Sequence, residues 1–408
     1  DRAFDQLQIE GPPASVADQV QAALTAVPDS TPSGYELPPT DHSAARVIVR
    51  SNGEAIRVYV HPQTLAVLHT IPEDQRIMRI LFKLHGELMM GDRGSNLVEL
   101  AASWTIILVL TGLFLWWPRN VRGLGGIVYP RPWNGSRIFW RDLHSVTGVW
   151  ISALVLFLLL SGLPWAKFWG SYFKTIRRAT GTAVAQQDWT TGSERPKRAQ
   201  GGSGEHSHHG GGSRSKDASR SNRKPVDLAG FDRVVATVRP LSLAAPVVVA
   251  PPSRGSEFWS AKSNAANRPK RVSLEVDGKT GEIASREDFK DRHWVDQVVG
   301  TCVAAHEGQL FGWPNQLLGL MTALGLVLLC VSGVVMWWRR RDPGVLGAPR
   351  PGPNARVSLA LLAVVLLLGI SFPLFGGSLL VVLLVEKTVL RRIPSVCRWL
   401  GLGQPAQV

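Results

Sequence analysis

Residues 315–338 read NQLLGLMTALGLVLLCVSGVVMWW, a run without a charged side chain. An α-helix needs about 20 apolar residues to cross the roughly 30 Å hydrocarbon layer of a bilayer. Two further runs are mostly apolar and of about this length, LVELAASWTIILVLTGLFLWW at 97–117 and VTGVWISALVLFLLLSGLPW at 146–165. Each run has tryptophan near its ends, where side chains of the membrane interface are found. The three runs therefore predict membrane-spanning helices.

A fourth apolar region occupies 357–390 and is followed by a basic tail at 391–408. It is long for one span and is interrupted by FPLFGG at 372–377. The region predicts either one kinked helix or a tight helical hairpin. Arg391 and Arg392 favour the hairpin, because a hairpin returns them to the side of the other arginine-rich segments.

The loops after the first and third spans are short and rich in arginine. Cytoplasmic loops carry an excess of lysine and arginine, so the segments 118–145 and 339–356 are expected in the cytoplasm. The N-terminal region and the long stretch 167–314 would then lie outside, in the periplasm of a Gram-negative cell. The sequence thus predicts a multi-pass inner-membrane protein surrounded by membrane lipids. The loop arginines are Arg119, Arg122, Arg131, Arg137 and Arg141, and then Arg339, Arg340, Arg341, Arg350 and Arg356.

The two outside segments show the same order of predicted elements. In the first, SVADQVQAALTAVPDSTPS at 15–33 predicts a helix with a serine N-cap, and ARVIVRSN and EAIRVYVHP predict strands. In the second, 226–241 predicts a helix, and RVSLEVDGKTGEIAS predicts a hairpin that turns on Asp277 and Gly278. The matching order indicates a repeat.

The repeat continues into the spans. LHGEL at 84–88 and AHEGQL at 305–310 each place a histidine before an apolar helix that ends in Gly-x-x-x-Trp-Trp-x-Arg. The second unit is also preceded by a span, with His144 at its entrance. The predicted fold is an α-helical membrane bundle with two small α+β extracytoplasmic domains, built by duplication of helix–domain–helix. We expect one more span, with a histidine at its cytoplasmic start, before the first unit.

Charge and cysteine content narrow the class of protein. On a soluble domain the net charge of +14 would indicate nucleic-acid binding. Here many basic residues directly follow apolar runs, where they set the orientation of the spans in the membrane. Three cysteines lie far apart without a CxxC pair, so neither a disulfide framework nor an iron–sulfur site is indicated. The Gly-, Ser- and His-rich segment 167–225 predicts a linker, whose EHSHH at 205–209 either binds a divalent metal weakly or is simply solvated.

Four motifs together carry a family resemblance: LHGEL, the Trp-Trp-x-Arg helix ends, RDLH at 141–144 and AHEGQL. As a set they resemble the PepSY-associated transmembrane protein family, over nearly the whole chain except the linker and the C-terminal segment. Members of that family include di-haem inner-membrane reductases of siderophore-bound iron. The resemblance implies PepSY-like periplasmic domains at 1–84 and 226–300, and membrane segments, two with a periplasmic-end histidine, at 85–117, 146–166 and 301–338.

The resemblance gives the histidines a chemical role, because a b-type haem in a bundle takes neutral imidazoles from two helices. His85 and His306 occupy equivalent positions of the repeat and would face each other across one haem. His144 would hold a second haem, with the histidine of the expected further span. Arg93 and Arg141 lie near the membrane faces, where they would pair with haem propionates. Alternatively, these histidines are interfacial residues without a ligand.

The implied activity is electron transfer across the membrane. Electrons from a quinol or another donor would pass through one or two haem b groups to a periplasmic ferric siderophore, and iron would be released after reduction. The sequence has no nicotinamide or flavin fingerprint and no CxxCH for covalent haem attachment. The main alternative is a membrane-anchored PepSY binding module that regulates a periplasmic protease or another envelope partner without redox activity. Another alternative keeps the electron transfer but has a different acceptor, such as copper or a methionine-sulfoxide system.

Overall fold

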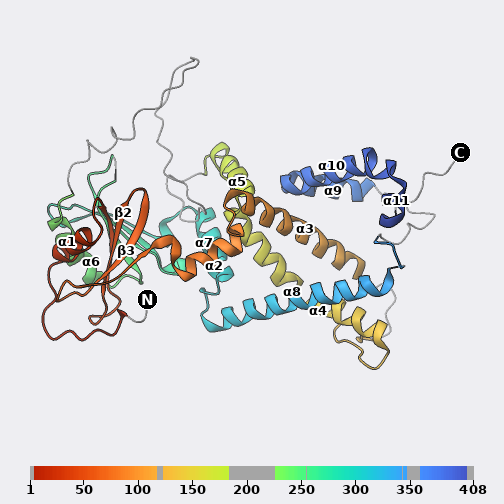
Figure 1. Ribbon diagram of the computed structural model, residues 1–408, viewed down its shortest axis with the longest axis horizontal. Coiled ribbons are helices and arrows are strands. Elements are labelled where there is room, and N and C mark those ends of the chain that lie inside the picture. The colour runs from red at the N-terminus through yellow and green to blue at the C-terminus, as the bar shows by residue number, and fades with distance from the viewer. Residues whose placement is uncertain are drawn as a thin grey trace, which may run out of the picture. The chain divides into compact units, whose positions relative to one another are not determined.

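The chain folds into two compact units, each assembled from two stretches of sequence (Figure 1). The sheet unit comprises Asp1–Phe82 and Ser193–Thr301, and the helical unit comprises Lys83–Gly192 and Cys302–Val408. The computed structural model describes residues 4–116, 123–182, 226–253, 255–341, 343–346 and 359–401.

In the described part of the sheet unit, eight strands form one antiparallel sheet in the order β4-β3-β2-β1-β5-β6-β7-β8. Each half is a meander, in which neighbours in sequence pair with one another. The strands are β1 (Thr31–Glu36), β2 (Ala45–Ser51), β3 (Glu54–Val60), β4 (Val67–Pro72), β5 (Val247–Ala250), β6 (Trp259–Ser263), β7 (Val272–Val276) and β8 (Ile283–Asp288).

The pairing of β1 with β5 joins the two halves. Tyr35 lies opposite Val249, and the amide of Leu37 donates to the carbonyl of Val247 at 2.9 Å. The two segments that the sequence indicated as separate small domains therefore share one sheet. Such a pairing is long-range, and alternating hydrophobic residues do not specify which two edges meet.

Two helices, α1 (Val16–Ala26) and α6 (Ala229–Val238), pack side by side on one face of the sheet. The predicted serine N-cap is confirmed, because Ser15 Oγ accepts from the amide of Asp18 at 3.0 Å. Asp232 of α6 accepts from the amide of Val16 at 2.6 Å, so a carboxylate from the second half caps the helix of the first.

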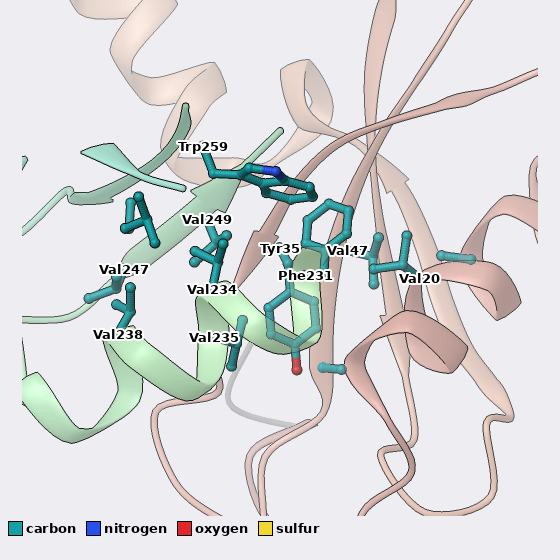
Figure 2. Packing of buried hydrophobic residues seen from close by; sticks show 14 of the residues in the cluster. Val20, Tyr35, Val47, Phe231, Val234, Val235, Val238, Val247, Val249 and Trp259 are labelled. Atoms are coloured by element: carbon teal, nitrogen blue, oxygen red, sulfur yellow. The ribbon is translucent and has the colours of Figure 1, made fainter. Parts of the chain in front are cut away.

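The core of the sheet unit lies between this helical layer and the sheet (Figure 2). Alternate strand residues point into it, as the period of two predicts. Phe231 of α6 and Trp259 of β6 meet edge to face with ring centroids 4.7 Å apart. A Cβ at Gly278 would come within 2.0 Å of Trp259 Nε1, so the turn after β7 requires glycine there. Burial raises the pKa of Tyr35, whose hydroxyl donates to Gln19 Oε1 at 2.8 Å.

Among its described residues, the helical unit has four helices long and apolar enough to cross a membrane. Three correspond to the predicted spans: α3 (Asp92–Trp116), α4 (Ser136–Gly162) and α8 (Trp313–Arg340). The fourth candidate covers Pro373–Arg392. The helices α3 and α4 begin before their apolar runs, because polar residues at the membrane interface remain helical. Helix α4 packs along both α3 and α8.

The C-terminal apolar region is a helical hairpin, formed by α9 (Leu359–Ser371) and α10 (Pro373–Thr388). Only Phe372 separates the two helices, and the proline after it cannot continue the hydrogen-bond ladder of α9. A Cβ at Gly376 would lie 2.6 Å from the carbonyl oxygen of Gly369, so the two backbones touch. Residues seven apart on a continuous helix would be separated by about 10 Å, which excludes the kinked helix. The short helix α11 (Pro394–Leu400) follows.

The segment after α4 departs from the linker predicted for 167–225. Its first part is helix α5 (Lys167–Ala179), because KFWGSYFKTIRRA places aromatic and basic residues on different faces of a helix. The linker prediction is therefore wrong for these residues. Residues 183–225, including EHSHH, lie outside the described residues.

Both halves of the chain present their elements in the same order. A helix and four strands lead to a short helix, α2 (Ile77–Glu87) or α7 (Trp294–His306), and then to a long apolar helix, α3 or α8. The short helices carry the histidines of the two sequence motifs, His85 and His306.

Candidate functional site

The helical unit brings His85 and His306 together. Their ring centroids are 6.3 Å apart, and the ring planes are inclined by 68°. His306 is the last residue of α7, and His85 lies in the last turn of α2. Residues 221 positions apart in sequence thus present two imidazoles to one another.

His306 is held from two sides. Asn315, in the first turn of α8, donates to the carbonyl of Ala305 at 2.8 Å and accepts from the amide of Leu310 at 3.3 Å, which fixes the loop after the histidine. Ser161 Oγ of α4 lies 2.9 Å from His306 Nδ1. Burial and the neighbouring His85 both lower the pKa of His306, which favours the neutral imidazole.

His144 occupies a similar setting on the other side of the helical unit. Its Nδ1 lies 3.0 Å from Ser332 Oγ of α8, whose side chain is fully buried. His144 and Ser161 are both on α4, and the helical rise places the two histidine settings about 25 Å apart along this helix. That separation is close to the thickness of the hydrocarbon layer.

The His85–His306 pair fits a haem better than a bare metal ion. No group of three or more His, Cys, Asp or Glu side chains within the described ranges is placed to hold a metal ion. A bare zinc ion would need such a group, whereas haem iron takes four nitrogens from its macrocycle and only two from the protein. With metal–nitrogen distances of about 2.0 Å, two imidazoles on one metal have centroids roughly 6.3 Å apart. The 6.3 Å separation in this chain matches that value.

The two arginines predicted near the haem edges differ in their surroundings. Arg93 is exposed in the first turn of α3. Arg141 forms an ion pair, in which its Nη2 lies 2.8 Å from Asp142 Oδ1, but its side chain remains 54% exposed. Arg131 pairs with the same carboxylate at 2.7 Å. Asp142 is fully buried and fixes the loop before α4, two residues ahead of His144.

Several polar residues of this unit were missed by the sequence analysis, among them the carboxylate of Glu99, which is 2% exposed. Its carboxylate accepts from the amides of Phe168 and Trp169 at 3.0 to 3.1 Å. These amides open α5, so a side chain from the membrane helix α3 caps α5. A lone glutamate inside the run at 97–117 was the signal, since charge in a span is usually functional or structural.

Ser161 and Ser332 were missed as well. Each stands directly before a glycine near the end of its helix, as LSG at 160–162 and VSG at 331–333. A Cβ at Gly162 would lie 3.5 Å from His306 Cε1, and one at Gly333 would lie 3.6 Å from His144 Cε1. A methyl group would fit at either position, but a larger side chain would meet the imidazole ring.

Three of the described histidines of the sheet unit have local roles. His61 Nδ1 accepts from the amides of Gln63 and Thr64 at 3.2 Å and shapes the turn after β3. The ring of His69 stacks on Phe4 with centroids 5.7 Å apart. His293 Nδ1 accepts from the amide of Val295 at the start of α7. These contacts need no ligand.

A pocket of about 580 Å³ lies at the seam between the two halves of the sheet. The residues of β2 and β3 that line the pocket alternate along each strand with valines of the core. The pocket therefore opens on the face of the sheet opposite α1 and α6. A chain of ion pairs crosses it, in which Glu36 binds both Arg46 and Arg57 at 2.7 Å. Burial alone would lower the pKa of Arg57, but Glu36 and Glu73 raise it overall. The lining residues are Glu36, Arg46, Ile48, Arg57, Glu73, Arg76, Ala245, Pro246, Val248 and Asn264.

Comparison with known proteins places the chain at the level of family. A search of the curated proteins gives no match. The family model described as PepSY-associated TM region matches residues 3–340, which cover the whole sheet unit and the spans α3, α4 and α8. The chain is a multi-pass membrane protein that belongs to the PepSY-associated TM region family.

Proposed function

We propose that this protein is a b-type haem protein of the inner membrane that carries electrons to a ferric chelate in the periplasm. The observation that carries the proposal is the approach of His85 and His306 to a centroid separation of 6.3 Å. Two imidazoles held so close, without a third acidic or thiol ligand in the described parts of the chain, would together hold a haem iron.

The proposed topology uses the basic ends of the spans. Arg339 donates to Ser136 Oγ at 2.6 Å, so the end of α8 and the start of α4 lie together, and both segments are rich in arginine. By the positive-inside rule this side would be cytoplasmic and the sheet unit periplasmic. His144 would then serve the cytoplasmic side, and His85 with His306 the periplasmic side. The matching order of elements supports an origin by duplication.

In the proposed mechanism the protein supplies position and environment. Haem bound between these histidines provides a reversible one-electron couple between ferric and ferrous iron. His85 and His306 would fix the iron near the periplasmic end of the spans, while the apolar walls of α4 and α8 would exclude water. One electron delivered to a ferric chelate yields ferrous iron, which oxygen donors bind less strongly, and a quinol or another donor would restore the electron.

The acceptor is proposed to bind the sheet unit. Its pocket at the β1–β5 seam is lined by both halves and by three guanidinium groups, from Arg46, Arg57 and Arg76, against the carboxylates of Glu36 and Glu73, which leaves one positive charge in excess. An anionic chelate of a few hundred cubic ångströms would suit a cavity of about 580 Å³ with these groups. The same pocket also favours the second candidate function, a membrane-anchored module that binds an envelope partner without redox chemistry.

The test is haem content in single and double variants made in haem-replete cells. His85→Ala and His306→Ala should each remove the same haem, so the double variant should lose no more than either single variant. His144→Ala should leave that haem in place. His69→Ala, in the sheet unit, is the matched control and should keep the wild-type haem content. Full haem in both His85→Ala and His306→Ala would contradict the pairing and favour the binding module.

A further inference from the structure

Two serine hydroxyls of the helical unit make the same set of contacts. Ser161 Oγ donates to the carbonyl of Phe157 at 2.7 Å and lies 2.9 Å from His306 Nδ1. Ser332 Oγ donates to the carbonyl of Leu328 at 2.7 Å and lies 3.0 Å from His144 Nδ1. The repetition at two places on different helices indicates a built arrangement rather than a chance contact.

The single hydrogen of each serine hydroxyl bears on whether the serine or the imidazole Nδ1 is the donor. A serine hydroxyl has one hydrogen, and in both cases the carbonyl four residues earlier accepts it. When that carbonyl takes the hydroxyl hydrogen, the serine oxygen accepts from the imidazole, and Nδ1 carries the hydrogen of this contact.

We propose that Ser161 and Ser332 are positioning residues that hold His306 and His144 as Nδ1–H tautomers and leave each Nε2 free as a ligand, the ligand role resting on the function proposed above. The neutral imidazole has one protonated nitrogen and one with a free electron pair. With Nδ1–H directed at the serine, the electron pair is on Nε2, at the far side of the ring. Partners of this kind orient a metal-bound histidine and make it a stronger donor.

The alternative is that these serine hydroxyls only hydrogen-bond backbone carbonyls of their own helices. Thr111 of α3 offers a direct comparison, because its hydroxyl donates to the carbonyls of Ile107 and Leu108 at 2.7 and 3.2 Å, and Gly112 follows it. A Cβ at Gly112 would have nothing within 4 Å. Thr111 therefore has the same bonds to its own helix as the two serines but contacts no histidine in the described residues. It supplies the matched control.

The first experiment needs no haem. The haem-free protein in detergent, labelled with ¹⁵N at histidine, is examined by long-range ¹H–¹⁵N NMR at about pH 8, where imidazoles are neutral. His306→Gln and His144→Gln assign the two signals among the ten histidines. In the wild type we expect the Nδ1–H pattern for both histidines. Ser161→Ala should shift His306, and Ser332→Ala should shift His144, towards a mixture of the two tautomers. Thr111→Ala should change neither. An Nε2–H pattern in the wild type would overturn the inference.

The second experiment tests the ligand role. In the haem-loaded protein, Ser161→Ala should weaken binding at the His306 site by roughly tenfold and move its midpoint potential in the positive direction, because a weaker donor stabilises ferric iron less. Ser161→Thr, which keeps the hydroxyl, should restore both values, and Thr111→Ala should leave both unchanged. An unchanged potential in Ser161→Ala would overturn the positioning role. Since the NMR pattern is measured without haem, failure of the proposed function and failure of the tautomer inference are separate results.

Discussion

In the sheet unit the fully buried side chains are mostly valines and aromatic residues, whereas the helical unit buries serines, Glu99 and Asp142 beside a few apolar residues. The reason is the surrounding medium. Water drives apolar residues inward in the sheet unit, while lipid gives the helices no such drive, so packing and polar contacts hold them together. A charged or polar side chain inside the helical unit therefore points to a specific task more strongly than one inside the sheet unit.

The largest effect is expected at a buried ion-pair cluster of the sheet unit, which departs from this contrast. Glu36→Ala would remove the buried carboxylate that Arg46 and Arg57 share, and should lower the free energy of unfolding by about 3–5 kcal/mol. Chemical unfolding of the full chain in detergent measures it. The control Glu54→Ala, at an exposed position of β3, should change stability by less than about 0.5 kcal/mol. A small effect at Glu36 would mean that the ion pairs are dispensable.

The next prediction compares one truncation in both units. Leu274→Ala removes a side chain that is 1% exposed in the sheet core and should cost about 2–5 kcal/mol. Leu324→Ala removes a side chain that is 56% exposed on α8 and should cost less than about 0.5 kcal/mol, because lipid or detergent surrounds it. Thermal unfolding of both variants gives the comparison. Equal losses would contradict the assignment of α8 to the membrane.

A smaller effect is expected at the polar joint between α3 and α5. Glu99→Ala leaves the amides of Phe168 and Trp169 without their acceptor and should cost about 1–3 kcal/mol. The local signature is faster hydrogen exchange in α5, which mass spectrometry detects. Glu99→Gln keeps an acceptor oxygen and should retain most of the protection. Unchanged exchange in Glu99→Ala would show that α5 is held by other contacts.

The smallest effect concerns a hydrogen bond between helices. Trp104 Nε1 of α3 donates to Ser378 Oγ of α10 at 3.0 Å. Such bonds contribute on average about 0.6 kcal/mol in membrane proteins, so Ser378→Ala should lower stability by roughly that amount. Thr111→Ala, which removes only a bond within α3, should be close to neutral. A loss of several kcal/mol at Ser378 would indicate that the hairpin α9–α10 depends on this single contact.

Much of the fold follows from patterns that act over short distances. Runs of apolar residues predicted the spans α3, α4 and α8, and the position of Ser15 predicted the start of α1. The hairpin of α9 and α10 was favoured by Arg391 and Arg392, and the contact of Gly369 with Gly376 now establishes it. The pairing of β1 with β5 was not predictable, because no local signal connects Tyr35 with Val249.

The candidate site was foreseen in part. The repeat singled out His85 and His306, and the structure brings their rings together, but their role as ligands remains a prediction. The serines behind the histidines were missed because a serine in an apolar helix usually bonds only its own backbone. The recurrence of Ser-Gly at 161–162 and 332–333, matched by Thr-Gly at 111–112, was the available signal.

The most direct measurement is the absorption spectrum of the purified protein in detergent, oxidised and then reduced, with haem quantified per chain. The account predicts the sharp reduced bands of a six-coordinate b-type haem, at least one haem per chain, and their loss in His306→Ala. A colourless protein from haem-replete cells, or a haem spectrum that survives both His85→Ala and His306→Ala, would contradict the central claim that these two histidines hold a haem.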